Sequence, residues 1–278
     1  MSPRLVTPLT LVSLVAAGTA AAQEEPLITP IAYGDAVSGE LTQDSPMLQD
    51  GSYFVVYGFE GEVGDEITVW LNSQDFNANA LLTDAADSLV AADDNAGGAC
   101  NAHVSTALPA TGRYHIYANS AEPGELGEFH LTLHEGVYPP EGQTACTGWV
   151  GLAGMIAVGD SATSLLGPDD RVLPNDSTAF YEVWQLSNPE GTPFTVDLSA
   201  PFDGAMILVR GLREVVTLDD DGGGGCNPRI AHVPEDRRAM RVVVTSREAF
   251  RGGEYQIHLR GVLLPAVNQP PCRPGTGG

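Results

Sequence analysis

Apolar and polar residues alternate with a period of two along much of the chain. The alternation is clear in residues 67–72, 114–119 and 129–134, and it returns in residues 255–259. Such a pattern is typical of strands that bury one face. Glycine- and proline-containing turns separate these segments, and no stretch of a dozen residues carries the apolar stripe of a helix. The pattern therefore predicts an all-β chain of antiparallel strands.

The pattern also occurs twice. The acidic, glycine-rich run of residues 93–101 reappears at residues 219–227, which is 126 positions further along (219 minus 93). The same offset pairs Phe76 with Phe202 and continues to the end of the last strand of each copy. A register sustained over this length indicates duplication. The sequence predicts two tandem antiparallel β-sandwich (jelly-roll-like) domains, at residues 23–146 and 147–272, and a flexible tail at 273–278.

The first 22 residues have the pattern of a signal peptide. Arg4 supplies a positive charge, an apolar stretch follows, and small residues end it before Gln23. The apolar stretch contains Pro8 and is shorter than the roughly 18 residues that a spanning helix needs. We therefore expect a secreted or periplasmic protein without membrane insertion.

The four cysteines fall at matching positions of the two copies. Four cysteines allow three pairings, but Cys100–Cys146 and Cys226–Cys272 are both separated by 46 positions, so the repeat selects these two. Zinc is a poor alternative, because each copy offers only two thiolates and no regularly spaced histidine. The sequence therefore predicts one disulfide bond in each copy, which suits an oxidising compartment.

The chain is strongly acidic, with a formal net charge of −23 and no lysine. The acidity is concentrated in residues 23–146, which hold 20 acidic residues and one basic residue, Arg113. Such a surface repels nucleic acid and attracts divalent cations or basic partners. Solubility of an exported protein is the simpler explanation of the same charge.

The duplicated acidic run offers a candidate metal site. Carboxylate and amide oxygens are the ligands that calcium prefers, and the glycines that follow allow backbone carbonyls to turn inward. Asp, Asn and Gly are also ordinary turn residues, so a purely structural loop is the alternative. The candidate ligands are Asp93, Asp94 and Asn95 in the first copy and Asp219, Asp220 and Asp221 in the second.

Two further groups of side chains could contact a partner. Trp70 and Tyr117 fall on the polar phase of their strands, and Trp149 and Trp184 have no evident place in a core, so these four are candidate ligand-binding residues. Packing inside or between the sandwiches is the alternative. The second copy also carries arginines that we expect to form a solvated basic face rather than to fix the two copies together, because surface ion pairs contribute little. They are Arg237, Arg238, Arg241, Arg247 and Arg251.

Several short motifs resemble one protein family. In the first copy they are residues 64–69, 76–82, 92–95, 108–114 and 127–131, and in the second they are residues 202–208, 219–221 and 253–257. Each copy resembles the bacterial pre-peptidase C-terminal domain, a β-sandwich found beside secreted proteases and related to collagen-binding modules. The resemblance implies a binding role. The second copy departs from the pattern at residues 189–193 and 239–241.

Catalytic motifs are absent from the repeat. No nucleophile, base or metal constellation is matched between the copies, and Gly159-Asp160-Ser161 has Gly34-Asp35-Ala36 as its counterpart, without the serine. The sequence therefore favours a non-enzymatic binding or targeting protein that recognises an extracellular polysaccharide or protein, with no certain cofactor beyond candidate calcium. An accessory or inhibitor of a separate secreted protease, or a hydrolase, is the alternative.

Overall fold

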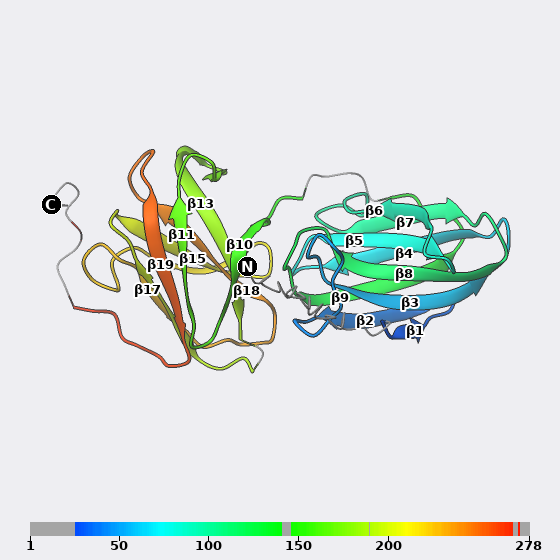
Figure 1. Cartoon of the computed structure of the whole chain (residues 1–278), viewed down its shortest axis with the longest axis horizontal. Helices are drawn as coiled ribbons and strands as arrows, with labels where there is room; N and C mark the ends of the chain where they lie inside the picture. The colour runs from blue at the N-terminus through cyan, green and yellow to red at the C-terminus, as the bar shows by residue number, and fades with distance from the viewer. Residues whose placement is uncertain (1–25, 141–145, 189, 269–271, 273–278) are drawn as a thin grey trace, which may run out of the picture.

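The computed structural model describes residues 26–140, 146–188, 190–268 and 272. Within these residues the chain forms 19 strands and no helix, so none of this part offers a helix that could cross a membrane. Four sheets stack in pairs as two sandwiches, which lie side by side along the long axis of the molecule (Figure 1). The predicted all-β sandwich architecture is confirmed. The expected signal peptide and tail lie outside the described residues.

The first sandwich consists of a five-stranded and a four-stranded sheet. The five-stranded sheet has the order β1 (Ile28–Pro30), β3 (Phe54–Gly61), β8 (Gly112–Ser120), β5 (Ala78–Asp84) and β6 (Leu89–Asp93). The four-stranded sheet has the order β2 (Ala36–Leu41), β9 (Gly127–Glu135), β4 (Glu66–Ser73) and β7 (Ala102–Ala107).

The second sandwich repeats this arrangement. Its larger sheet has the order β10 (Leu152–Ala157), β13 (Asp176–Ser187), β18 (Met240–Ser246), β15 (Gly204–Arg210) and β16 (Glu214–Asp219), with β12 (Arg171–Leu173) paired to β13. The other sheet has the order β11 (Ser161–Leu166), β19 (Gly253–Arg260), β14 (Phe194–Ser199) and β17 (Arg229–His232).

The two sandwiches share details beyond strand order. In both, the first strand of the larger sheet pairs in parallel, β1 with β3 and β10 with β13, while the other ladders are antiparallel. Both also have an irregularity at equivalent points of the ladders β5–β6 and β15–β16. Alternate residues of each strand point into a separate apolar core, as the period-two pattern predicts.

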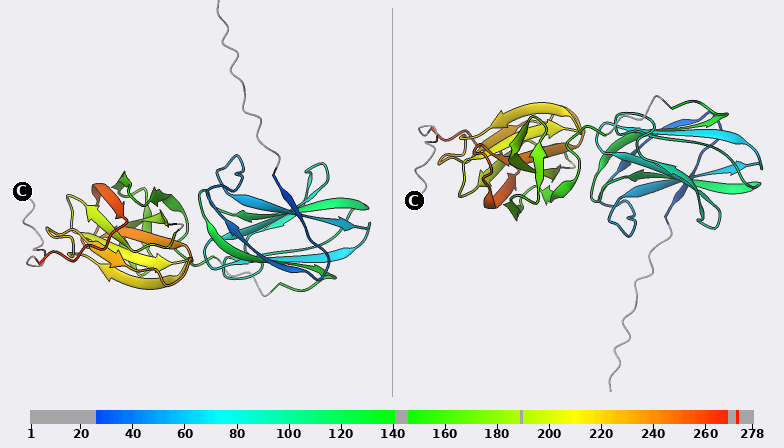
Figure 2. Two further views of the ribbon diagram at one scale, coloured as in Figure 1. Left: turned by 90° about the horizontal axis from the view of Figure 1, so that it is seen from below. Right: turned by 90° about the horizontal axis from the view of Figure 1, so that it is seen from above.

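The disulfide bonds are those that the repeat predicts. Cys100 is bonded to Cys146, and Cys226 to Cys272. Each bond ties the acidic loop of its sandwich to the segment that follows the last strand. Two further views show the sandwiches meeting end to end (Figure 2). The candidate site is lined by residues of both sandwiches.

Candidate functional site: a cleft between the sandwiches

The duplicated acidic loops are built in the same way. Oδ2 of Asp93 accepts hydrogen bonds from the backbone N–H groups of Ala96 (2.8 Å) and His103 (2.9 Å). Oδ2 of Asp219 accepts from the matching groups of Gly222 (2.8 Å) and Arg229 (2.7 Å). These carboxylates therefore shape their loops, and their Oδ2 atoms are occupied by the protein's own backbone.

The remaining acidic candidates are placed differently in the two loops. Asp94 is exposed, and Asp220 forms an ion pair with Arg247 at 3.6 Å. Asp221 and Asp203 bring carboxylate oxygens within 4.8 Å of each other, beside the disulfide-bonded Cys272. Oδ1 of Asp221 is buried without a hydrogen-bond partner in the described chain, as is Oδ1 of Asn95, its counterpart. Burial and the negative charge of Asp221 raise the pKa of Asp203.

The four candidate aromatic residues do not form one surface. Trp184 lies in the second core, where its indole N–H donates to the Tyr255 hydroxyl at 2.6 Å, so its ring is not available to a ligand. Trp149 is half-buried and packs edge-on against Tyr181. Trp70 and Tyr117 are half-buried on different sheets of the first sandwich. The packing alternative therefore holds for Trp184.

A buried ion pair joins the two sandwiches. Nη2 of Arg241, in β18, lies 3.0 Å from Oε1 of Glu125, in the loop between β8 and β9, and both side chains are fully buried. Arg241 also donates to the backbone carbonyls of Asp75 (2.7 Å) and Trp149 (2.5 Å). Burial raises the pKa of Glu125, while Arg241 and the N–H of Asn77 partly offset this effect.

The expectation of a solvated basic face is wrong for two of the five arginines. Arg241 is buried against the first sandwich, and Arg238 reaches Asp75 of the first sandwich at 3.4 Å. The general argument from weak surface ion pairs does not apply here, because these partners are buried. Arg247 and Arg251 do pair locally and remain exposed, with Asp220 and Glu248 respectively.

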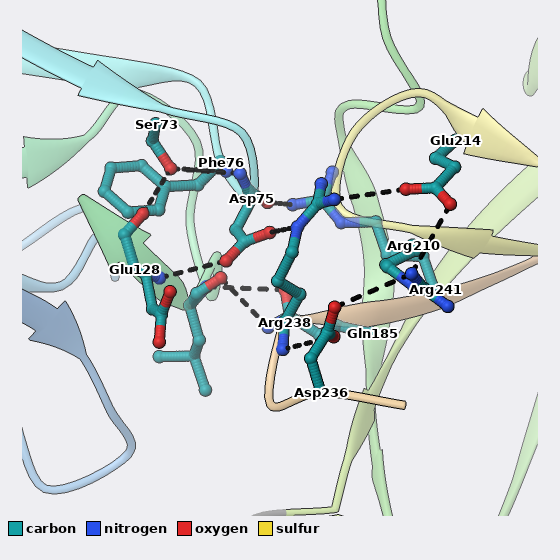
Figure 3. Close-up of polar contacts among 11 residues, drawn as sticks. Ser73, Asp75, Phe76, Glu128, Gln185, Arg210, Glu214, Asp236, Arg238 and Arg241 are labelled. Atoms are coloured by element: carbon teal, nitrogen blue, oxygen red, sulfur yellow. Dashed lines mark hydrogen bonds and ion pairs between the residues drawn. The ribbon is translucent and has the colours of Figure 1, made fainter. Parts of the chain in front are cut away.

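Beside this ion pair lies an open cleft with a volume of about 950 Å³. Its floor holds the Asp75 carboxylate, which accepts from the N–H of Glu128 at 3.1 Å and is paired to Arg238 (Figure 3). Nη1 of Arg238 also forms an ion pair with Oε2 of Glu214 at 3.1 Å. Burial raises the pKa of Asp75, which its hydrogen bond from Glu128 and the charge of Arg238 only partly offset.

A second arginine crosses the cleft. Arg213 of the second sandwich donates to the carbonyl oxygens of Ala99 (2.6 Å) and Thr147 (2.8 Å). Both cleft arginines are thus fixed by acceptors of the protein, so their guanidinium groups are held in place before any partner arrives.

The opposite wall of the cleft is acidic. Glu40 of β2 and Glu128 of β9 are exposed and stand directly opposite each other in the strand ladder. His130 follows on the same wall, with its Nδ1 3.3 Å from the Ser38 hydroxyl. Like charges directly opposite destabilise a strand pair. A bound cationic group would relieve this repulsion.

Among the residues of the cleft and of the adjacent buried ion pair, sequence reasoning named only Arg238 and Arg241 as candidates, and it expected both to be solvated. The signal available was the difference between copies. At the offset of 126, Glu125 matches Arg251 and Arg241 matches His115, so the charge pattern departs from the repeat at these positions. The exposed Arg247 departs in the same way, because it matches Ala121, so such departures mark outward-facing positions without picking out the buried pair.

Comparison with known proteins gives only distant similarities. No protein-family model and no curated protein matches the sequence. Among solved structures, the chain is similar to the pre-peptidase C-terminal domain of a collagenase from Bacillus anthracis, with 15% identity, a TM-score of 0.32, and coverage of 40% of this chain and 98% of that one. This structure belongs to the family that the sequence resembles.

Two other solved structures are similar at comparable levels. PliG from Aeromonas hydrophila, a periplasmic inhibitor of g-type lysozyme, has 15% identity and a TM-score of 0.29, and the match covers 38% of this chain and 96% of PliG. A putative secreted protein from Eubacterium rectale has 12% identity and a TM-score of 0.24, with coverage of 83% of this chain and 74% of that chain. What these proteins bind or inhibit is known of them and is not carried over to this chain.

Proposed function

We propose that this protein is a non-catalytic binding protein that acts outside the cytoplasm and recognises a protein or polysaccharide partner in the cleft between its sandwiches. The observation that carries the proposal is the cleft itself. Its volume falls in the range of ligand sites, roughly 300 to 1,000 Å³, and its polar groups are anchored before binding. The two disulfide bonds support a location in an oxidising compartment.

The acidic wall indicates the chemistry of the partner. Glu40 and Glu128 repel each other in the free protein, so a lysine, arginine or amino-sugar group between them removes a cost as well as adding contacts. The excess of acidic residues in the first half draws such a partner toward the cleft. We therefore propose a partner with basic groups on its surface.

The test is binding to the immobilised mature chain by a panel of collagen, cell-surface polysaccharides and secreted proteins at physiological ionic strength. The double variant Glu40→Gln/Glu128→Gln should weaken capture of the true partner at least tenfold. Glu254→Gln is the matched control, because Glu254 occupies the position of Glu128 in the second sandwich but faces Leu165. If the wild type, the double variant and Glu254→Gln bound the partner equally well, the cleft would not be the binding site.

Catalysis is the opposing possibility. If the purified chain turned over an ester, peptide or glycoside, and one substitution abolished turnover, the protein would be a hydrolase and the binding proposal would be wrong. An accessory or inhibitor of a separate secreted protease is the second candidate function. It requires that the captured partner be a protease whose activity or folding changes on binding.

Calcium binding is proposed only for the second loop, where Asp203 and Asp221 approach each other and Oδ1 of Asp221 is buried without a partner in the described chain. Millimolar calcium should raise the melting temperature of the oxidised chain, because a ligand of the folded state stabilises it. The increase should disappear in Asp221→Asn. No change in the wild-type chain would exclude this site.

A further inference from the structure

The contact between the sandwiches has a counterpart that the described residues leave uncovered. The first sandwich places Glu125 of its head loop, residues 121–126 between β8 and β9, against Arg241 of β18 in the second. Residues 210–213, at the turn between β15 and β16, lie beside Arg241 and contact Gln74 and Ala99 of the first sandwich, and together with Arg241 they form the receiving face. The second sandwich has an equivalent head loop, residues 247–252. The first has an equivalent receiving face around His115 of β8 and the turn 84–87.

The charges on the uncovered pair are exchanged. In the contact that forms, the head loop supplies the acid Glu125 and the receiving face supplies its basic partner Arg241, while Arg213 beside it donates to the carbonyl of Ala99, outside the head loop. In the uncovered pair the head loop supplies Arg251 at the position of Glu125. The receiving face supplies His115 at the position of Arg241 and Asp87 at the position of Arg213. The Asp87 carboxylate accepts from the Tyr117 hydroxyl at 3.1 Å and lies 3.5 Å from Nδ1 of His115, but its side chain is 68% exposed and attracts an arginine of a partner.

The uncovered receiving face contains buried polar atoms without partners. His115 is 8% exposed and Thr83 is 7% exposed, yet Nε2 of His115 and Oγ1 of Thr83 have no hydrogen-bond partner within the described chain. His115 takes the position of Arg241, whose guanidinium is satisfied largely by the docked first sandwich and the linker. Buried polar groups of proteins are almost always hydrogen-bonded. Both atoms are enclosed by the surrounding chain, and Nε of Arg241 on the docked face is likewise without a partner in the described chain, so this is a feature that the two faces share.

The uncovered head loop exposes an aromatic side chain on a strained backbone. Phe250 is 68% exposed and has a φ of 56°, in the left-handed region that disfavours bulky residues. Its counterpart in the docked head loop is Gly124, with a φ of 72°. Strain of this kind collects at functional positions, and a projecting Phe beside an Arg is typical of an interface anchor.

We propose that this chain associates head to tail with copies of itself, the head loop 247–252 of one copy docking on the receiving face around His115, Asp84 and Asp87 of the next. The contact is heterologous, so each copy keeps one free head loop and one free receiving face until a ring closes or a chain ends. This proposal is independent of the cleft and of its partner.

A second copy fits this surface better than an unrelated molecule. The head loop exposes the basic side chains of Arg247 and Arg251. The first sandwich is strongly acidic, with 20 acidic residues and one basic residue between positions 23 and 146. The same fold already brings a head loop against the equivalent strand once within the chain, where Glu125 meets Arg241. An anionic polysaccharide could satisfy the arginines but not the receiving face.

The test is sedimentation velocity on the full mature chain, from low micromolar to several hundred micromolar concentrations and at low and high ionic strength. The weight-average mass should at least double over this range at low salt, and salt should reduce the association because exposed charges are screened. Arg251→Glu alone and Asp87→Arg alone should be monomeric. Mixed in equal amounts, the two variants should associate again, because the carboxylate introduced in one then faces the guanidinium introduced in the other.

Two more variants complete the design. Phe250→Gly removes the anchor and relieves the left-handed strain, so it should weaken association at least tenfold without loss of fold. Arg237→Glu, an equal change of charge on an exposed loop outside both surfaces, should associate as the wild type does. A wild-type chain that stays monomeric at every concentration would overturn the proposal, as would association that persists in the single variants or fails to return in the mixture.

Discussion

The two sandwiches have the same topology, but the head loop of the first is buried against the second, whereas the head loop of the second is exposed. Glu125 of the first is fully buried against Arg241, whereas Arg251 at the matching position of the second is exposed and pairs with Glu248 in its own loop. The repeat therefore preserves the residues that build each sandwich and varies those that face outward. The difference in charge between Glu125 and Arg251 accompanies the difference in their surroundings.

The contrast between the buried and the exposed head loop is tested most directly by substituting Arg241. Replacing it with Met leaves Glu125 buried without its partner, which typically costs about 3 to 5 kcal/mol. We expect Arg241→Met to lower the free energy of unfolding by that amount at neutral pH, measured by urea denaturation.

Arg247→Met is the control, because Arg247 forms an ion pair whose side chains are 58% and 40% exposed. Such a pair contributes at most about 1 kcal/mol. If Arg241→Met and Arg247→Met were equally stable, the buried ion pair would not stabilise the contact between the sandwiches. The difference in burial between the two head loops would then have no effect on stability.

The disulfide bonds test what the copies share. Each closes a loop with a sequence separation of 46, for which the chain-entropy model gives roughly 4 kcal/mol as an upper figure. Cys100→Ser/Cys146→Ser and Cys226→Ser/Cys272→Ser should therefore lose similar amounts of stability, each in the transition of its own sandwich. A large inequality, observed by denaturation under oxidising conditions, would show that the two bonds have different roles.

Most of the fold could be predicted from the sequence. The period-two alternation places strands at β4, β8, β9 and β19, and the offset of 126 both reveals the duplication and selects the disulfide pairing. These features are local in sequence or repeated, so a pattern can report them.

The candidate site could not be predicted in this way. Glu125 and Arg241 are 116 residues apart, and their burial depends on how one sandwich docks on the other. Nothing in the sequence around Arg241 distinguishes it from the exposed Arg247. Trp184 shows the same limit, because only the structure shows that it faces Tyr255 in the core.

The acidic loops allow a finer comparison. Oδ2 of Asp93 accepts three backbone N–H groups, of Asn95, Ala96 and His103, while Oδ2 of Asp219 accepts two, of Gly222 and Arg229. We expect Asp93→Ala to lower the free energy of unfolding by roughly 2 to 3 kcal/mol, and Asp219→Ala by about 1 kcal/mol less. Asp94→Ala, at an exposed neighbour, is the control for both in the same denaturation series. The reverse order would mean that the second loop relies on Asp219 for more than these hydrogen bonds.

The buried head loop should also give the stability a distinctive pH dependence. Because burial raises the pKa of Glu125 in the folded state, its protonated form favours folding, and this contribution is lost as the pH rises through the raised value. Each unit of the increase corresponds to about 1.4 kcal/mol. Relative to Glu125→Gln, the wild-type chain should therefore become less stable as the pH is raised from 4 toward neutrality, roughly the range over which a raised glutamate titrates. A difference that stays constant with pH would mean that Arg241 fully compensates the burial.

The smallest effect is expected at the exposed head loop, and its sign is opposite. Phe250 adopts a φ of 56°, which costs a bulky residue roughly 1 kcal/mol relative to glycine. Phe250→Gly should therefore stabilise the isolated chain by up to about 1 kcal/mol, measured by thermal denaturation of dilute protein so that association does not contribute. Gly124→Phe is the reciprocal change and should destabilise, because Gly124 also has a positive φ and lies in the loop that docks on the second sandwich. If removing Phe250 instead lowered the melting temperature of the monomer, its ring would be stabilising its own sandwich, and the exposed head loop would have to be explained without a partner.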